Sequence, residues 1–114
     1  MSTSIYITTE RQYRQLVNGI SDLTPFDEVF DRLDEISYYT NFSGNLNRLY
    51  GVIDQFGRFE DEFTSEFAYL GYVCSVKMLE HVVASLDSAD VYDKWDPIID
   101  RFENEDKILI LVDA

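Results

Sequence analysis

Apolar side chains recur at helical spacing over much of this chain, most clearly after Thr24-Pro25. A helix over residues 24–36 would gather five apolar positions on one face, and these are Phe26, Val29, Phe30, Leu33 and Ile36. Thr24 is a typical N-cap and Pro25 a typical first helical residue, while Asp27 completes a capping box. The pattern therefore predicts a helix that begins here and buries this face.

The middle of the chain predicts further helices with similar apolar faces. Residues 46–56 form one, with Ser43 as its N-cap and Gly57 as the left-handed residue that ends it. Residues 59–70 form another, stopped by Gly71, and Ser75 caps a third over residues 76–86. The last two segments also fit one long helix that continues through Gly71.

Two strands and two short helices are predicted toward the ends of the sequence. Ser4–Thr8 alternates between polar and apolar residues, which predicts a strand, and Glu10–Leu16 predicts a short helix. Asp96-Pro97 begins another short helix, and the apolar run Lys107–Val112 is too short for a helix and predicts a buried strand. We expect a mainly helical α+β single domain over residues 1–114, with four to five helices and short terminal β-strands that could pair with each other.

Charge changes this picture more than any motif. The 114 residues include 22 acidic and 9 basic side chains, a net charge of −13, whereas a small domain needs a magnitude of only about 2–8 for solubility. Such an excess argues against direct binding to nucleic acid or to anionic membranes, which requires lysine and arginine. A basic partner or a salt-rich habitat would explain it, and the uneven distribution of the acids favours the partner.

The acids fall into three blocks, at residues 22–35, 60–66 and 87–106. On the helix predicted over residues 24–36, acids four residues apart are separated by about 6 Å along the axis, close to the separation of successive phosphates in a nucleic-acid strand. Exposed helices usually interleave both signs of charge, and this one carries Arg32 alone. We predict a partner-binding surface made of Asp27, Glu28, Asp31, Asp34, Glu35, Glu60, Asp61, Glu62, Asp90, Asp93, Asp96 and Asp100.

Aspartates at positions 87, 90, 93 and 96 recur every third residue, which raises the question of calcium. An EF-hand loop counted from Asp87 needs glycine at its sixth position and glutamate at its twelfth. This chain has Tyr92 and Ile98 at those positions. The spacing does not predict a calcium site, and we expect neither a metal nor a cofactor.

Candidate catalytic residues are few. His81 lies beside the apolar face of its predicted helix and Cys74 lies among apolar residues, so we interpret both as structural. The sequence has no nucleophile elbow, no P-loop and no glycine-rich phosphate cradle. Among 22 acids some pair always looks suitable for acid–base chemistry, so that signal is not specific. We expect a binding protein, not an enzyme.

The compartment follows from three further observations. A single cysteine precludes an internal disulfide. The first residues, MSTSIYITTERQ, lack the basic and apolar regions of a signal peptide. No run approaches the roughly 20 apolar residues that a membrane span needs. We expect a cytoplasmic protein.

Residues 39–92 contain a series of short motifs, which are, in order, Tyr39-Thr40, Leu46-Asn47-Arg48-Leu49-Tyr50, Glu60-Asp61-Glu62, Gly71-Tyr72, Ser75 to Leu86, and Ser88-Ala89-Asp90-Val91-Tyr92. This series resembles the central region of the ArdA antirestriction proteins. ArdA proteins are longer, multi-domain products of mobile elements that imitate the shape and charge of B-form DNA and block type I restriction–modification enzymes. The resemblance implies a phage or mobile-element inhibitor of a restriction–modification or CRISPR-type defence protein, acting through surface carboxylates.

A shorter segment resembles the inhibitory helix of barstar-like ribonuclease inhibitors, with Tyr38-Tyr39 ahead of residues 44–50. That family presents carboxylates where this chain has Asn47 and Gly51, so an immunity protein against a nuclease toxin ranks second. Both resemblances imply a basic nucleic-acid-binding protein as partner, with no direct contact to nucleic acid or membrane. Surplus tyrosine and phenylalanine would also suit a homodimer interface.

Overall fold

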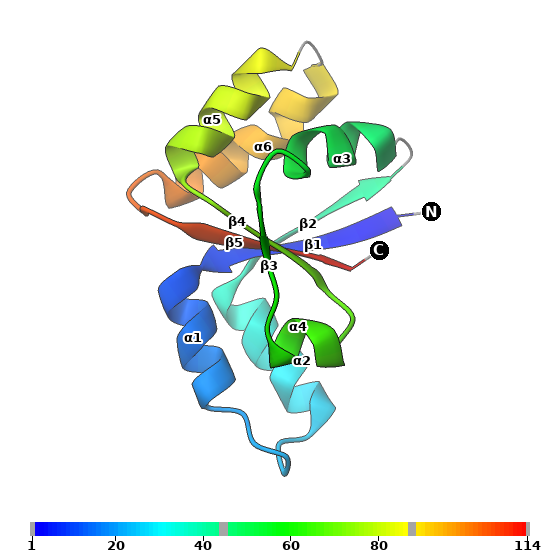
Figure 1. The fold of residues 1–114 in the computed structure, drawn as a ribbon, viewed down its shortest axis with the longest axis vertical. Coiled ribbons are helices and arrows are strands. Elements are labelled where there is room, and N and C mark those ends of the chain that lie inside the picture. The colour runs from blue at the N-terminus through cyan, green and yellow to red at the C-terminus, as the bar shows by residue number, and fades with distance from the viewer. Residues whose placement is uncertain (1, 44–45, 87–88, 114) are drawn as a thin grey trace.

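The computed structural model describes residues 2–43, 46–86 and 89–113, and Figure 1 shows their arrangement. Five antiparallel strands form one sheet in the order β2-β1-β5-β4-β3. The strands are β1 (Ser2–Thr9), β2 (Tyr38–Ser43), β3 (Gly57–Phe59), β4 (Leu70–Cys74) and β5 (Ile108–Asp113). The helices are α1 (Glu10–Asn18), α2 (Phe26–Ile36), α3 (Leu46–Ile53), α4 (Glu62–Glu66), α5 (Val76–Ser85) and α6 (Ala89–Phe102). The predicted α+β class is confirmed.

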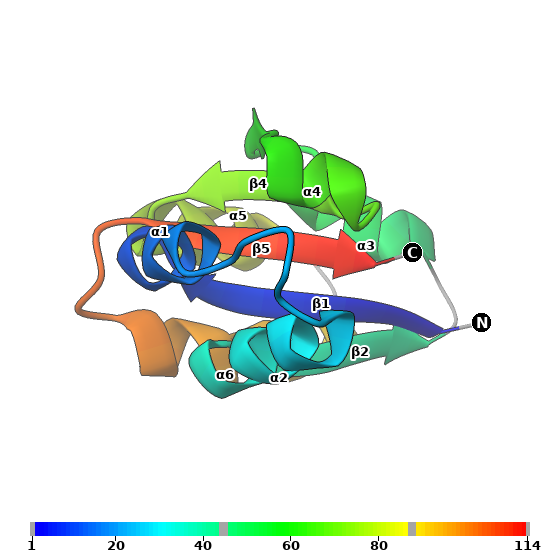
Figure 2. The same ribbon diagram turned by 90° about the horizontal axis from the view of Figure 1, so that it is seen from below.

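The helices form two layers, one on each face of the sheet (Figure 1, Figure 2). α1, α2 and α4 pack on one face, and α3, α5 and α6 pack on the other. β5 lies at the centre of the sheet, so its residues 108, 110 and 112 are buried against one layer and Leu109 and Leu111 against the other. This two-sided burial explains the unbroken apolar run that predicted a buried strand.

The terminal strands pair as expected. β1 and β5 are antiparallel, with a register that runs from Ser4 opposite Asp113 to Thr9 opposite Ile108. β1 also pairs with β2, which forms one edge of the sheet, and β4 pairs with β3 at the other edge. The sheet therefore depends on three inner strands, of which the middle one comes last in the sequence.

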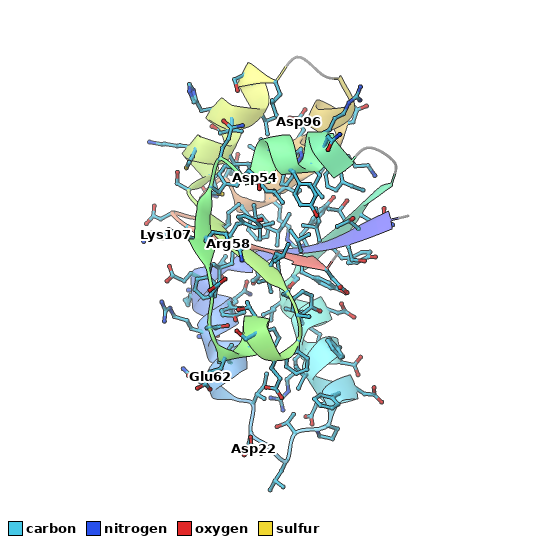
Figure 3. The ribbon with its side chains drawn as sticks, turned by 45° about the vertical axis from the view of Figure 1, so that its right-hand side comes forward. Asp22, Asp54, Arg58, Glu62, Asp96 and Lys107 are labelled. Carbon is cyan, nitrogen blue, oxygen red and sulfur yellow. The ribbon has the colours of Figure 1, made fainter. Side chains whose placement is uncertain are left out.

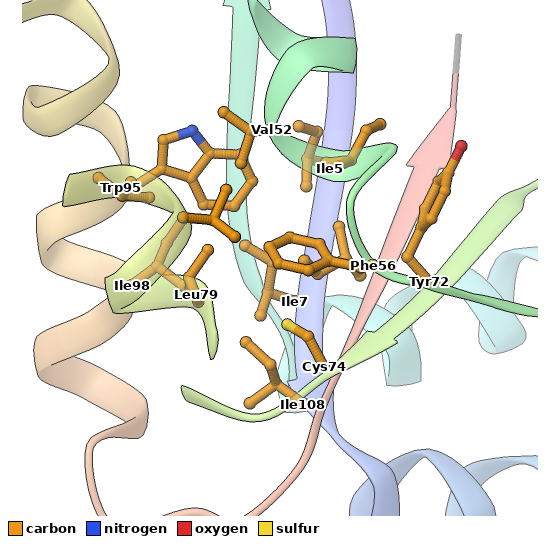
Figure 4. Close-up of a cluster of buried hydrophobic side chains, with 14 of the residues drawn as sticks. Ile5, Ile7, Val52, Phe56, Tyr72, Cys74, Leu79, Trp95, Ile98 and Ile108 are labelled. Atoms are coloured by element: carbon orange, nitrogen blue, oxygen red, sulfur yellow. The ribbon is translucent and has the colours of Figure 1, made fainter. Parts of the chain in front are cut away.

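The larger core lies between the sheet and the layer of α3, α5 and α6 (Figure 4). Trp95 of α6 is fully buried there, and its ring centroid lies 5.5 Å from that of Phe42 in β2. Leu79 and Ile98 are also fully buried in this core, which includes Cys74 of β4. Full burial of such side chains stabilises the fold by about 1.5–3 kcal/mol each, so this core fixes α6 firmly against the edge strand β2.

Two predicted helices are confirmed with their local chemistry. α1 covers the predicted segment Glu10–Leu16. α5 begins after Ser75, whose hydroxyl oxygen accepts a hydrogen bond from the backbone N–H of Met78 at 3.0 Å. None of the helices within residues 2–43, 46–86 and 89–113 has the length and hydrophobicity of a membrane span.

The start of α2 differs from the prediction. Pro25, not Thr24, occupies the N-cap position, and no side chain caps the helix there. The Thr24 hydroxyl instead accepts a hydrogen bond from the backbone N–H of Ser21 at 3.0 Å, within its own turn. Phe26 and Phe30 were expected in the core but are 63% and 39% exposed. Val29 and Leu33 take the buried face of α2, while the rings of Phe26 and Phe30 lie beside that face and pack against Phe67.

Residues 57–74 correct the sequence interpretation most strongly. Gly57 does not end a helix but begins β3, and Gly71 lies within β4, opposite Phe59. The segment predicted as a helix over 59–70 is therefore strand, short helix and strand, and the alternative of one long helix through Gly71 is wrong. A Cβ atom on Gly71 would clash with the carbonyl oxygen of Phe59, so this glycine permits close strand pairing and does not mark a helix end.

Two further helix boundaries are also corrected. Ser43 was predicted to cap α3 but is the last residue of β2, and residues 44–45 after it lie outside the described part. Pro97 was predicted to begin the last helix but lies inside α6. Its ring is exposed. Proline inside a helix removes one backbone hydrogen bond and crowds the carbonyl four residues before it. Burial of Trp95 and Ile98, on either side of Pro97 in the sequence, holds α6 against the core despite that cost.

Candidate partner-binding surface

The acids predicted on the first long helix all lie on the solvent side of α2. Val29 and Leu33 are buried beneath it, and a turn of 3.6 residues directs the acidic positions away from that face. The exposed acids are Asp27, Glu28, Asp31, Asp34 and Glu35. Their exposure agrees with the sequence analysis, while their binding to a partner stays a prediction.

Arg32, the single basic residue of α2, is already engaged. Its guanidinium donates one hydrogen bond to Oε1 of Glu28 at 2.7 Å and another to the carbonyl oxygen of Gly19 at 3.1 Å. Within the described ranges, the other four acids of α2 form no ion pair. Their carboxylates therefore remain available to a cation from outside the molecule.

A second acidic group lies on α6. Asp93, Asp96 and Asp100 are exposed, whereas Trp95 and Ile98 of the same helix are fully buried. The side chain of Asp90, predicted for the same surface, lies outside the described part of the structure, as does Asp87. α6 thus repeats the arrangement of α2, with apolar residues inward and carboxylates outward.

The structure places α2 and α6 on opposite faces of the sheet but near the same edge. Figure 2 shows both helices beside β1 and β2, and the guanidinium of Arg101 in α6 lies 5.6 Å from the ring centroid of Tyr38 in β2. The two acidic helices therefore flank the edge strand. Asp22 and Glu62 lie toward one end of the molecule and Asp96 toward the other in Figure 3.

Asp61 has a structural role that the sequence analysis missed. Its Oδ1 accepts from the backbone N–H of Thr64 at 2.9 Å, which caps α4, and the Thr64 hydroxyl accepts from the N–H of Asp61 at 2.9 Å. Its Oδ2 accepts from the hydroxyl of buried Tyr13 at 2.6 Å. Both carboxylate oxygens are used inside the fold, so Asp61 is a poor contact for a partner.

Tyr13 carries the electrostatic effect of this contact. Burial first, and then the hydrogen bond and negative charge of Asp61, raise the pKa of the Tyr13 hydroxyl well above its ordinary value. Tyr13 therefore remains a hydrogen-bond donor throughout the physiological range. The pair joins α1 to the start of α4 and stabilises the layer that also contains α2.

The neighbours of Asp61 differ from it. Glu60 is exposed and accepts a hydrogen bond from Arg58 at 3.0 Å, and Glu62 is exposed at the first position of α4. The middle acidic block is therefore divided among a surface ion pair, a structural cap and two outward carboxylates, Glu62 and Glu66. These two line a pocket together with residues of α2 and extend its acidic surface.

A pocket of about 430 Å³ with a mixed apolar and acidic lining adjoins α2, and the apolar spacing did not indicate it. It lies between the α1–α2 connection, the start of α2, and α4. Leu23 is 92% exposed and Phe26 is 63% exposed at its mouth. Leu23, between the segments predicted as helices over residues 10–16 and 24–36, was the available signal, because an apolar residue between two elements has no helix or strand face to join.

The described residues contain no group of three or more His, Cys, Asp or Glu that could hold a metal ion. Cys74 is buried as expected, and burial raises the pKa of its thiol to about 12, which keeps it from forming a reactive thiolate near neutral pH. His81, expected to be structural, is exposed on α5.

Comparison with known proteins leaves the chain without an assigned relative. No model of a known protein family, no curated protein sequence and no solved structure matches it. The resemblances to ArdA and to barstar-like inhibitors therefore stay predictions.

Proposed function

We propose that this protein is an acidic inhibitor that binds a basic nucleic-acid-binding protein in the cytoplasm and occupies the surface that would otherwise hold nucleic acid. The observation that carries the proposal is the set of four exposed α2 carboxylates, Asp27, Asp31, Asp34 and Glu35, none of which forms an ion pair with another described residue. Like charges so close together disfavour the helix. A partner rich in lysine and arginine relieves that repulsion, which makes association favourable.

Rigidity supports the same function. α2 is held by buried Val29 and Leu33, and α6 by buried Trp95 and Ile98, so the carboxylates of both helices project from a fixed framework. Acids four residues apart on such a helix are separated by about 6 Å along its axis. A groove whose cations contact successive phosphates would meet a comparable row of negative charges, and occupancy alone would block nucleic acid.

The test measures displacement of nucleic acid from candidate partners. Fluorescein-labelled duplex DNA is bound to a purified type I restriction enzyme or CRISPR effector, and the release of DNA by this protein is followed by fluorescence anisotropy at two salt concentrations. We expect release that weakens steeply as salt rises, because exposed charge pairs are screened. Failure to release DNA from either class at low salt would contradict the proposal.

A matched pair of variants separates the α2 surface from net charge. The triple variant Asp27→Asn, Asp31→Asn, Asp34→Asn removes three charges from α2. Exposed ion pairs contribute about 0.2–1 kcal/mol each, so inhibition should weaken about 3-fold to 150-fold. The control variant Asp54→Asn, Glu80→Gln, Glu103→Gln removes three exposed charges elsewhere and should inhibit nearly as well as the unaltered protein. Equal loss in both variants would show that net charge alone acts.

A further inference from the structure

The pocket beside α2 has both buried apolar side chains and unusually exposed large apolar side chains in its lining. Val29 and Phe63 line it and are 1% and 4% exposed. Leu23 and Phe26 also line it but remain 92% and 63% exposed. The ring of Phe67 packs against both α2 and α4: its centroid lies 5.6 Å from that of Phe26 in α2 and 4.8 Å from that of Phe63 in α4. Grouped exposed apolar side chains of this size mark interaction sites on folded proteins.

Acidic side chains surround the same pocket. Asp22, Glu62 and Glu66 line it and are exposed, and Asp27 follows Phe26 on α2. No described residue of the lining is lysine or arginine. An apolar centre with a polar rim is the general anatomy of protein interfaces, and here the rim carries a single sign of charge.

We propose that this pocket is the anchor point for the partner and that its occupant is a basic protein segment with one large apolar or aromatic side chain between lysines and arginines. The side chain enters against Val29, Phe63 and Phe67, and the flanking cations meet Asp22, Glu62 and Glu66. This inference rests on the proposed function, because it assumes a basic protein partner. It adds that the acids of α2 and α6 steer the partner while the pocket supplies the apolar contacts, which generally dominate affinity.

Charge complementarity selects this occupant over the alternatives. A second copy of the chain would bring another net charge of −13 against a rim that is already negative. Nucleic acid would bring phosphates to the same carboxylates. A basic segment alone offers both the apolar contact and the opposite charge.

Two peptides test the pocket directly. Both are capped pentapeptides of equal charge, Lys-Arg-Trp-Arg-Lys and Lys-Arg-Gly-Arg-Lys, titrated into the isotope-labelled protein at low salt and followed by NMR chemical shifts. We expect the Trp peptide to bind at least about fivefold tighter, as is typical for a buried aromatic anchor. Its shifts should centre on residues 20–30 and 62–67. Phe26→Ser should abolish the difference, whereas Met78→Ser, which alters an exposed apolar residue of α5, should preserve it.

The outcomes separate this inference from the function on which it rests. Equal affinity for both peptides would overturn the pocket as anchor but leave an acidic surface that recognises cations. Binding of neither peptide at low salt would overturn both proposals. Sedimentation that shows a dimer lost in Phe26→Ser would make a second copy the occupant and overturn the basic segment.

Discussion

Asp61 offers a direct test of whether an acid on this surface serves the fold or a partner. Replacing it with alanine removes the N-cap acceptor of α4 and the acceptor of the Tyr13 hydroxyl. Loss of an N-cap costs about 1 kcal/mol, and a buried hydroxyl left without a partner costs about 1–3 kcal/mol. Asp61→Ala should therefore lower the free energy of unfolding by about 2–4 kcal/mol.

Two further variants give the controls. Asn is also a good N-cap and its side-chain oxygen can accept from Tyr13, so Asp61→Asn should lose about 1 kcal/mol or less. Glu62→Ala alters the next residue, which is exposed, and should change stability by no more than about 0.5 kcal/mol. The measurement is urea unfolding at 25 °C and pH 7, followed by circular dichroism. If Asp61→Ala unfolds at the same urea concentration as Glu62→Ala, the structural role of Asp61 is refuted.

Three other predictions concern single backbone or side-chain features. In urea unfolding, Gly71→Ala should lower the free energy of unfolding by about 1–3 kcal/mol, because the new Cβ clashes with Phe59. Gly51→Ala should raise it by about 0.5–1 kcal/mol, because its Cβ meets nothing within 4 Å. The pKa of Tyr13 is raised in the folded state, so Tyr13 stabilises the fold up to about pH 10 and this contribution is lost as the pH rises further. Between about pH 10 and 12, the free energy of unfolding should therefore decline less steeply with pH for Tyr13→Phe than for the unaltered protein. Ala68 has a left-handed φ of 58°, so Ala68→Gly should raise the free energy of unfolding by up to about 1 kcal/mol, which a higher melting temperature would show.

Much of the fold could be predicted where one residue pattern had one structural meaning. The run at Ile108–Asp113 is too short and too apolar for anything but a buried strand, and Ser75 caps its helix as expected. The segment around Gly71 could not be predicted in this way. Phenylalanines spaced by four residues fit a helix locally, but pairing between β3 and β4 depends on neighbours distant in sequence.

The candidate surface could be predicted only where a local residue pattern determines which side chains are exposed. The exposure of Asp31 and Asp34 follows from helix periodicity alone, because Leu33 must point inward. The role of Asp61 could not be read from periodicity, since its partner Tyr13 is 48 positions away. Predicting the pocket would have required the position of α4 relative to α2, which only the sheet topology determines.

The central position of β5 also shapes how the chain reaches this fold. β1 and β5 pair residues about a hundred positions apart, and such non-local contacts slow folding. Until they form, the run at 108–112 is an exposed segment of the kind that assembles between chains. Asp106 and Asp113 flank it as gatekeepers. The net negative charge would thus make incompletely folded chains repel one another while β5 lacks its partner strands. The yield of refolding should fall as added salt screens that repulsion.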